Sequence, residues 1–187
     1  QIAALTTTQV AAIETADFVE LDTAQIAALT TAQVAQLTTG QVAALTTAQL
    51  SNLGSDDLNA LSSSQFSALS STQVASLTSD QIGTLQSDDV RAISSAGLRA
   101  WSTDQLAALS ETNMGALTTA QVASLTTAQV SSLVTDDLNA LGTAQFAALT
   151  TAQVTSLTGA QVGGLVSDDL RAMTTAQFGA MSSVQIG

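Results

Sequence analysis

Residues 29–36 read Leu-Thr-Thr-Ala-Gln-Val-Ala-Gln, and variants of this octad fill the whole chain. Stepping by eight residues from Ile2 or from Leu5 meets an apolar side chain every time, at 24 positions in the first column and 23 in the second. Gln stands one residue before the first column at 17 of its 24 positions. Because the period is never broken, the sequence predicts one continuous repeat array over residues 1–187, with no linker and no domain boundary.

A longer period overlies the octad. Four octads carry an Asp pair in place of Ala-Gln, namely Asp56 with Asp57, Asp88 with Asp89, Asp136 with Asp137, and Asp168 with Asp169. The first pair precedes the third by ten octads, the second precedes the fourth by ten, and Phe66 precedes Phe146 by the same offset. This offset indicates a ten-octad block that has been duplicated.

The eight-residue period excludes one long helix. At about 3.6 residues per turn, an octad advances roughly 80° beyond two full turns, so the apolar columns would spiral around a helix or a coiled coil. Strands are disfavoured because the apolar residues of an octad lie three apart, whereas a half-buried strand alternates with a period of two. Thr and Val nevertheless favour strands, so a β-solenoid remains the alternative fold.

Each octad carries its own helix-start signal. Thr30-Thr31-Ala32-Gln33 has the form of a capping box, in which the first hydroxyl accepts from the third helical N–H and Gln reaches back to the N-cap N–H. Leu29 and Val34 stand where a hydrophobic staple would place them. The sequence therefore predicts an all-α protein of very short capped helices, one per eight-residue repeat.

Such short helices need neighbours to be stable, because helix nucleation is costly. We expect the octads to stack as a solenoid, wound open or closed into a toroid, with Leu and Val inside and Thr, Ser and Gln outside. Small residues after the first column, such as Ala43-Ala44 and Gly163-Gly164, would let adjacent helices approach closely.

The composition excludes most site chemistry. The chain has no His, Cys or Pro, so no imidazole or thiolate is present to bind a transition metal or to act in catalysis. We therefore expect no enzyme activity, no catalytic residues and no cofactor. Three basic residues against 15 acidic ones, a net charge of -12, predict no nucleic-acid binding and no attraction to an anionic membrane.

No apolar run approaches the ~20 residues that a membrane-spanning helix needs, so we expect no membrane insertion. The chain begins at Gln1 rather than Met, which suggests a fragment of a longer polypeptide.

The octads, for example Leu-Thr-Thr-Ala-Gln-Val-Ala-Ser at residues 117–124, resemble the tandem repeats of very large bacterial proteins, often beside secretion or adhesin-like segments. The resemblance covers the whole chain and implies a toroid-like helical bead array. It also implies an extracellular or cell-surface location, and partners that are the flanking repeats of the parent chain, with a surface or glycan partner left undefined. It supplies no catalytic residue.

The Asp pairs are the one periodic charged feature. Carboxylate oxygens suit Ca²⁺, so the pairs are weak candidate metal ligands. Adjacent residues point in different directions, however, and no known calcium-loop pattern is present. The favoured interpretation is that the pairs complement the positive end of a helix dipole, with no metal bound. The same divergence argues against a catalytic carboxylate pair.

Three other features have structural and functional readings. The second hydroxyl of each pair, such as that of Thr31 or Thr119, could belong to a flat array that orders water or ice, whereas the favoured reading engages the hydroxyls in helix caps. Arg91 and Arg171 follow Asp pairs and predict local ion pairs. Trp101 occupies the Leu column and predicts a large core residue.

The sequence thus predicts a non-enzymatic structural or adhesive spacer module of a larger secreted or surface bacterial protein. The alternative is a ligand-binding module, for Ca²⁺ at the Asp pairs or for ice at the Thr array.

Overall fold

The computed structural model describes residues 2–187, and within that range every secondary-structure element is a helix. It holds a short 3-10 helix, η1, and 23 α-helices of four to six residues. The prediction of one short helix per octad is confirmed, and the β-solenoid is excluded for these residues. The elements are η1 (Ile2–Ala4), α1 (Thr7–Ala11), α2 (Thr15–Val19), α3 (Thr23–Ala27), α4 (Thr31–Val34), α5 (Thr39–Ala44), α6 (Thr47–Ser51), α7 (Ser55–Leu58), α8 (Ser63–Ser67), α9 (Ser71–Ala75), α10 (Ser79–Gly83), α11 (Ser87–Ala92), α12 (Ser95–Arg99), α13 (Thr103–Ala107), α14 (Glu111–Ala116), α15 (Thr119–Ser124), α16 (Thr127–Ser132), α17 (Thr135–Ala140), α18 (Thr143–Ala148), α19 (Thr151–Ser156), α20 (Gly159–Gly163), α21 (Ser167–Ala172), α22 (Thr175–Ala180) and α23 (Ser183–Ile186).

The predicted capping box starts most of these helices. At α15, the Gln121 N–H donates to Thr118 Oγ1 at 3.2 Å, and the Thr118 N–H donates to Gln121 Oε1 at 2.7 Å. The preceding helix ends because Leu117 (φ −54°, ψ 140°) and Thr118 (φ −73°, ψ 156°) are both extended. A Leu-Thr pair therefore closes one helix and opens the next, and no described residue needs a positive φ.

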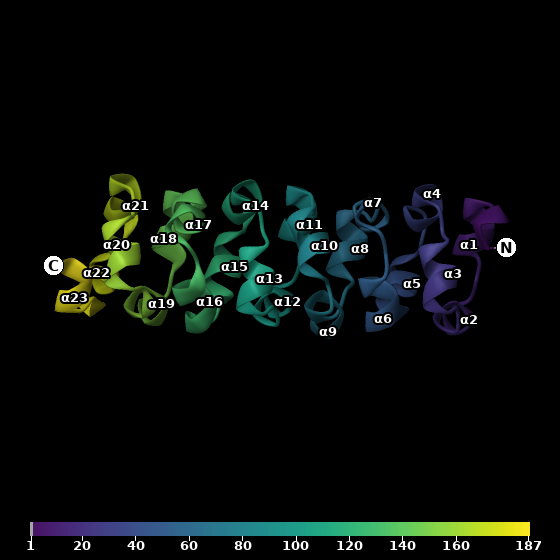
Figure 1. The fold of residues 1–187 in the computed structure, drawn as a ribbon, viewed down its shortest axis with the longest axis horizontal. Coiled ribbons are helices and arrows are strands. Elements are labelled where there is room, and N and C mark those ends of the chain that lie inside the picture. Colours follow the sequence, from purple (N-terminus) through teal and green to yellow (C-terminus); the bar gives the residue numbers. More distant parts are fainter. Residues whose placement is uncertain (1) are drawn as a thin grey trace.

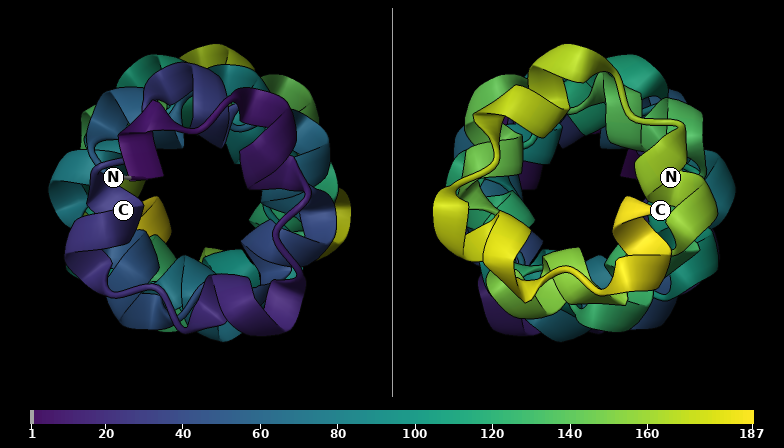
Figure 2. Two further views of the ribbon diagram at one scale, coloured as in Figure 1. Left: turned by 90° about the vertical axis from the view of Figure 1, so that its right-hand side faces the viewer. Right: turned by 90° about the vertical axis from the view of Figure 1, so that its left-hand side faces the viewer.

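The helices wind into an open rod. Its two ends lie at opposite ends of the long axis (Figure 1). Viewed along that axis the ribbon forms a ring, and with the N-terminal end facing the viewer the chain runs clockwise as it recedes (Figure 2, left). The structure is thus a right-handed superhelix, the open form of the two arrangements that the sequence allowed rather than a closed toroid.

One superhelical turn takes about three and a half octads. Each helix packs against the third helix after it, as α12 does against α15. Glutamine side chains bond to carbonyl groups 28 and 31 residues earlier, as Gln121 does with Ile93 and Val90. Each octad therefore advances by two sevenths of a turn around the axis.

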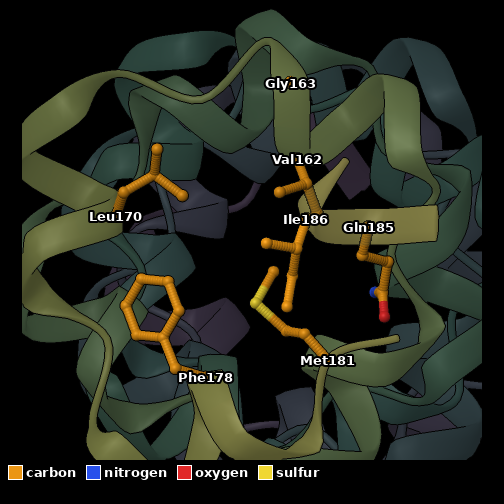
Figure 3. Close-up of a pocket in the computed structure, with 7 residues that line it drawn as sticks. All are labelled: Val162, Gly163, Leu170, Phe178, Met181, Gln185 and Ile186. Carbon is orange, nitrogen blue, oxygen red and sulfur yellow. The ribbon is translucent and has the colours of Figure 1, made fainter. Parts of the chain in front are cut away.

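Both apolar columns lie inside the rod. Val122 is 0% exposed and Leu125 is 3% exposed, and the buried residues of the two columns form one continuous core from Val10 to Met173. At the C-terminal end, the side chains of Leu170 and Phe178 project toward the axis (Figure 3). Trp101 is buried in this core, as predicted.

The expected position of the glutamines was wrong. Most Gln side chains before the first column are buried rather than exposed, with Gln41 at 1% and Gln121 at 2%. The sequence analysis placed these residues outside because a carboxamide is polar. The structure instead buries them between successive turns, where hydrogen bonds satisfy both ends of the group.

Small residues allow close approach at particular places. A Cβ at Gly115 would lie 2.7 Å from the carbonyl oxygen of Ala140, one turn further on. A Cβ at Gly164 would lie 2.6 Å from Thr135 Cγ2, whereas one at Gly163 would meet nothing within 4 Å. The predicted close approach is therefore real at some of these positions and absent at others.

The longest helices have six residues, so none among residues 2–187 has the length and apolar character needed to cross a membrane.

Removing one residue should damage the array far more than removing one octad. Deleting Ala128 shifts the register of the three glutamines that reach across it, Gln129, Gln145 and Gln153. Deleting residues 125–132 restores every such spacing. We expect thermal unfolding, followed by far-UV circular dichroism, to drop by more than about 10 °C for the first variant and by only a few degrees for the second. Equal losses would mean that the octad is not the structural unit.

Candidate functional site

The column of glutamines forms a ladder that joins each turn to the one before it. Gln121 shows the pattern: its Oε1 accepts from its own N-cap N–H, while its Nε2 donates to the carbonyl oxygens of Val90 and Ile93, both at 2.8 Å. The same geometry recurs at Gln41, Gln81 and Gln153. One carboxamide thus caps its own helix and satisfies the end of a helix one turn away.

The ladder varies along the array, and full-length Gln65, for example, donates only to the carbonyl of Leu37. Asn113 is one methylene shorter than Gln, and its Nδ2 reaches only the nearer carbonyl, that of Leu85, at 2.6 Å. At Val74, the indole Nε1 of Trp101 donates to the carbonyl at 2.8 Å, and Gln105 instead donates to Ala75 and Leu77. Trp101 therefore has a hydrogen-bonding role that the sequence did not indicate.

Gln121→Glu removes the hydrogen-bond donor of Gln121 without changing the size of the side chain, so it tests the contribution of that donor. The new carboxylate keeps the shape of Gln but places a charged oxygen opposite the carbonyls of Val90 and Ile93, with no donor between them. We expect the free energy of unfolding at pH 7, measured by urea titration, to fall by about 2–4 kcal/mol.

Gln36→Glu is the matched control, since Gln36 is exposed and has no side-chain hydrogen bond within residues 2–187. It should change stability by less than about 0.5 kcal/mol. Similar losses at both sites would show that the ladder contributes nothing and that added charge alone destabilises the array.

The two members of each Asp pair lie in different environments. The second Asp occupies the Gln column: Asp89 is 5%, Asp137 8% and Asp169 3% exposed, and Asp57 is half-buried. The first members, Asp56, Asp88, Asp136 and Asp168, are all exposed. The carboxylates of a pair therefore diverge, as adjacent helical residues must.

The Asp pairs stand in the first turns of helices that have no side-chain cap. Their N-cap residues are Gly54, Gln86, Val134 and Val166, and none of these side chains accepts a capping hydrogen bond. This arrangement supports the reading that the acidic residues complement the positive end of the helix dipole where the hydroxyl is missing.

The Asp-pair helices share one side of the rod. Asp57, Asp89, Asp137 and Asp169 follow one another at intervals of four, six and four octads. Four octads run half an octad past one turn and six fall one octad short of two turns, so the offsets cancel and the four residues stay within about two sevenths of a turn of one another. Helices α7, α11, α17 and α21, together with α14 carrying Glu111, accordingly line the upper edge of Figure 1. We call this side the acidic edge. The sequence did not predict the acidic edge, because the octad does not reveal how many octads make one superhelical turn.

The acidic edge does not gather carboxylates into a metal site. Among residues 2–187, no group of three or more acidic side chains could hold a metal ion. The inner Asp of a pair faces neighbouring turns instead: the Thr31 hydroxyl donates to Asp57 Oδ1 at 2.8 Å. Calcium binding at the pairs stays an untested alternative.

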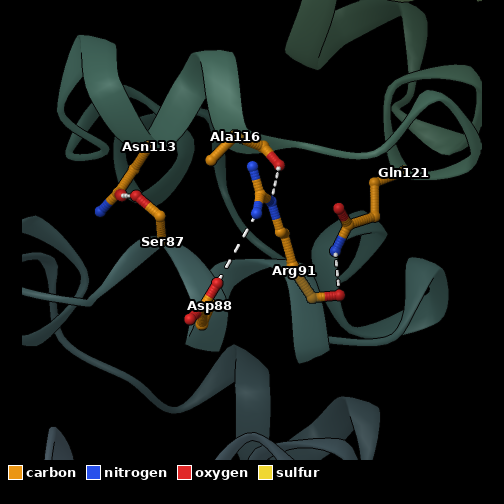
Figure 4. Close-up of polar contacts among 6 residues, drawn as sticks. All are labelled: Ser87, Asp88, Arg91, Asn113, Ala116 and Gln121. Atoms are coloured by element: carbon orange, nitrogen blue, oxygen red, sulfur yellow. Dashed lines mark hydrogen bonds and ion pairs between the residues drawn. The ribbon is translucent and has the colours of Figure 1, made fainter.

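Two arginines on the acidic edge, Arg91 and Arg171, form ion pairs with Asp residues of their own helices, as predicted. Arg91 Nη1 lies 3.6 Å from Asp88 Oδ1, and Arg171 Nη1 lies 3.4 Å from Asp168 Oδ1. These pairs are largely exposed, so each contributes at most about 1 kcal/mol. Arg91 Nε also donates to the Ala116 carbonyl of the next turn at 3.1 Å, so its side chain bridges two turns (Figure 4).

Burial raises the pKa of three of the inner carboxyl groups. It raises the pKa of Asp89 from 3.8 to about 6; the Gln86 backbone N–H opposes the rise, and the charge of Asp88 adds to it. Burial likewise raises the pKa of Asp137, with Glu111 and Asp136 adding to the effect. It also raises the pKa of Asp169, with Asp168 adding, and Asp169 Oδ2 is buried without a hydrogen-bond partner in the described part of the chain.

The raised pKa of Asp89 predicts that mild acid stabilises the protein. Folded Asp89 takes up a proton near pH 6, whereas the unfolded chain does so near 3.8, so the folded state binds more protons between these values. The contribution is therefore present below pH 3.8 and is lost as the pH rises through 6. We expect the urea midpoint to rise when the pH is lowered from 7 to about 5.

Asp89→Asn should mimic this protonation at pH 7. By the register that Asn113 shows, the new amide reaches the carbonyl of Leu61, which we expect to stabilise the fold by roughly 1 kcal/mol and to flatten the pH dependence. Asp88→Asn, at the exposed neighbour, should leave the pH dependence in place. A urea midpoint for Asp89→Asn at or below that of the wild type would contradict the assignment.

The first hydroxyl of each pair serves as a helix cap, as predicted. Thr126 Oγ1 accepts from the Gln129 N–H at 3.1 Å, and the same contact recurs at most helix starts. Because successive octads are rotated by two sevenths of a turn, the exposed second hydroxyls point in different directions around the rod. Consecutive octads therefore form no flat hydroxyl plane.

Comparison with known families agrees with this repeat architecture. The family model described as the ALTTAQ repeat matches residues 10–47, 50–87, 82–119 and 130–167, which together cover most of the chain. No curated protein matches the sequence.

Proposed function

This chain belongs to the ALTTAQ repeat family, and from that premise we propose that it is a non-enzymatic structural or adhesive spacer within a larger secreted or surface-displayed bacterial protein. The observation that carries the proposal is the ladder of Gln carboxamides, which links every turn of the rod to the next. Such a ladder makes length a direct function of octad number.

The rod is suited to hold flanking segments apart. Its core runs along the axis without interruption, so no hinge divides the described residues into separate bodies. Each turn contacts only its neighbours, so octads can be added or lost without redesign of the rest. Selection for a given reach can then act on repeat number alone.

The outer surface supports the non-enzymatic and adhesive parts of the proposal. It presents Ser and Thr hydroxyls that already serve as caps, together with the acidic edge. The chain has no imidazole or thiol, and its buried carboxyls are separated by a turn or more along the column. A hydroxyl-rich, acidic surface offers polar contacts to a surface or glycan partner while repelling anionic polymers.

Lengthening the array tests the spacer role. A second copy of residues 57–136 inserted after Asp136 adds ten octads in register. We expect small-angle X-ray scattering to show a rod longer by roughly two fifths, in proportion to the octads added, with an unchanged cross-sectional radius.

The matched control inserts residues 57–135, one residue fewer, and should give a bent or partly unfolded particle. An in-register insertion that thickens the particle without lengthening it would overturn the proposal. Localisation is tested separately, by looking for the parent polypeptide outside the cells that produce it.

A further inference from the structure

Two valines are exposed on the side of the rod. Val134 is 61% and Val166 is 48% exposed. The other exposed large apolar residues within residues 2–187 lie in the outermost turns, and they are Leu5, Phe178, Val184 and Ile186. The chain continues for more than a full turn after Val134 and does not cover it, so this exposure is a property of the side of the rod and not of an end.

Both valines stand where a helix cap is expected. Val134 is the N-cap of α17 and Val166 the N-cap of α21, and neither side chain makes a capping hydrogen bond. Thr126 and Thr150 show the usual arrangement, in which a hydroxyl at this position accepts from the helix and stabilises its start. Each Val therefore gives up a cap and leaves apolar surface in water, so it contributes to neither the helix start nor the core.

The two valines belong to neighbouring turns that Asn139 holds together. Asn139, in α17, accepts from the Val166 N–H and donates to the Gly164 carbonyl oxygen, both at 3.1 Å. Helices α17 and α21 accordingly follow one another along the upper edge of Figure 1. We call the surface formed by Val134, Val166 and the exposed Asp136 and Asp168 the valine patch.

Uncompensated negative charge surrounds Val134. Asp136 has no ion-pair partner among residues 2–187, whereas Asp168 pairs with Arg171 at 3.4 Å. Helix α14 packs against α17, and its Glu111 lies close enough to raise the pKa of Asp137. The valine patch thus combines apolar surface with carboxylates that are open to a positively charged partner.

The first copy of the ten-octad block has the acidic residues without the apolar ones. Gly54 and Gln86 stand where the second copy has Val134 and Val166. The Gln86 Nε2 donates to the Asn59 carbonyl oxygen at 3.1 Å, so this side chain is used within the rod. The same fold accommodates Gly and Gln at these positions, and the valines are therefore a separate feature of the second copy.

We propose that the valine patch binds a positively charged polypeptide segment that carries aliphatic side chains. The aliphatic groups cover Val134 and Val166 and remove apolar surface from water, while Lys or Arg side chains pair with Asp136 and Glu111. A second copy of this chain is a poor occupant, because its net charge of -12 repels the acidic edge. Binding at the side of the rod does not depend on the spacer role, since octad number does not enter it.

A labelled amphipathic peptide, with Leu on one helical face and Lys on the other, is the probe. Val134→Gly combined with Val166→Gln installs the residues of the first copy, so the variant is expected to fold, which its circular dichroism spectrum checks. We expect fluorescence anisotropy to show a dissociation constant about tenfold higher than that of the wild type, because the apolar contacts are lost. A peptide of equal charge with Ser in place of Leu should bind the wild type more weakly, and both proteins equally.

A second pair of substitutions tests the charges. Glu111→Gln combined with Asp136→Asn should weaken binding of the Leu-containing peptide and reduce its dependence on salt. The matched control is Glu14→Gln combined with Asp17→Asn, which removes the same two exposed side-chain types at α2, on the lower edge of Figure 1. The control should bind the peptide within about twofold of the wild type.

Three results would overturn the proposal. The first is no measurable binding of the Leu-containing peptide to the wild type. The second is equal binding of the two peptides, or equal affinity of the wild type and the Val134→Gly, Val166→Gln variant for the Leu-containing peptide, because attraction would then be ionic alone. The third is self-association of the wild type that this variant abolishes, since it would assign the patch to a second copy.

Discussion

The architecture depends on one side chain that hydrogen-bonds in two directions. In each consensus octad the Gln oxygen accepts from the backbone of its own helix start, and its nitrogen donates to a helix end one turn away. Helices of four to six residues leave most of their backbone groups at a terminus, where no intrahelical partner exists. A chain made only of helix ends can be buried only if side chains supply those partners, and the carboxamide, with a donor and an acceptor, supplies both.

This constraint explains which substitutions the column accepts. Asn113 keeps the donor but loses reach, and it retains one of the two contacts. Trp101 supplies an indole donor from the neighbouring column. Asp supplies only acceptors while it is ionised, and burial raises the pKa of Asp89, Asp137 and Asp169. These three carboxyls are thus places where the ladder lacks a donor, and the main cause of their raised pKa is burial between turns.

The surface pattern follows from two lengths, the octad and the superhelical turn, because a turn does not contain a whole number of octads. Octads wound into turns of about three and a half octads distribute most side chains around the rod, which prevents the Thr columns from forming a plane. The Asp pairs escape this scattering because four octads run slightly past one turn while six fall short of two, so the offsets of their intervals of four, six and four octads cancel. The duplication preserves the effect, since ten octads fall only half an octad short of three turns. An acidic edge therefore exists although no segment of the sequence is densely acidic.

The sequence was sufficient for everything that acts within one octad. Unbroken apolar columns predicted the interior, and the Thr-x-x-Gln form predicted each helix start, because capping depends on residues three apart. It also predicted Trp101 as a core residue and the Arg91–Asp88 pair, which are both local or column-based inferences. It failed at Gln121 and its equivalents, which polarity alone assigned to the surface.

Only the tertiary structure decided the open superhelix, the length of its turn, the second role of Gln and the acidic edge. These features depend on which octads become neighbours across turns. Which octads become neighbours depends on the packing of Val and Leu around the axis and on close approaches such as that of Gly115 to Ala140. Neither can be read from the sequence of a single repeat.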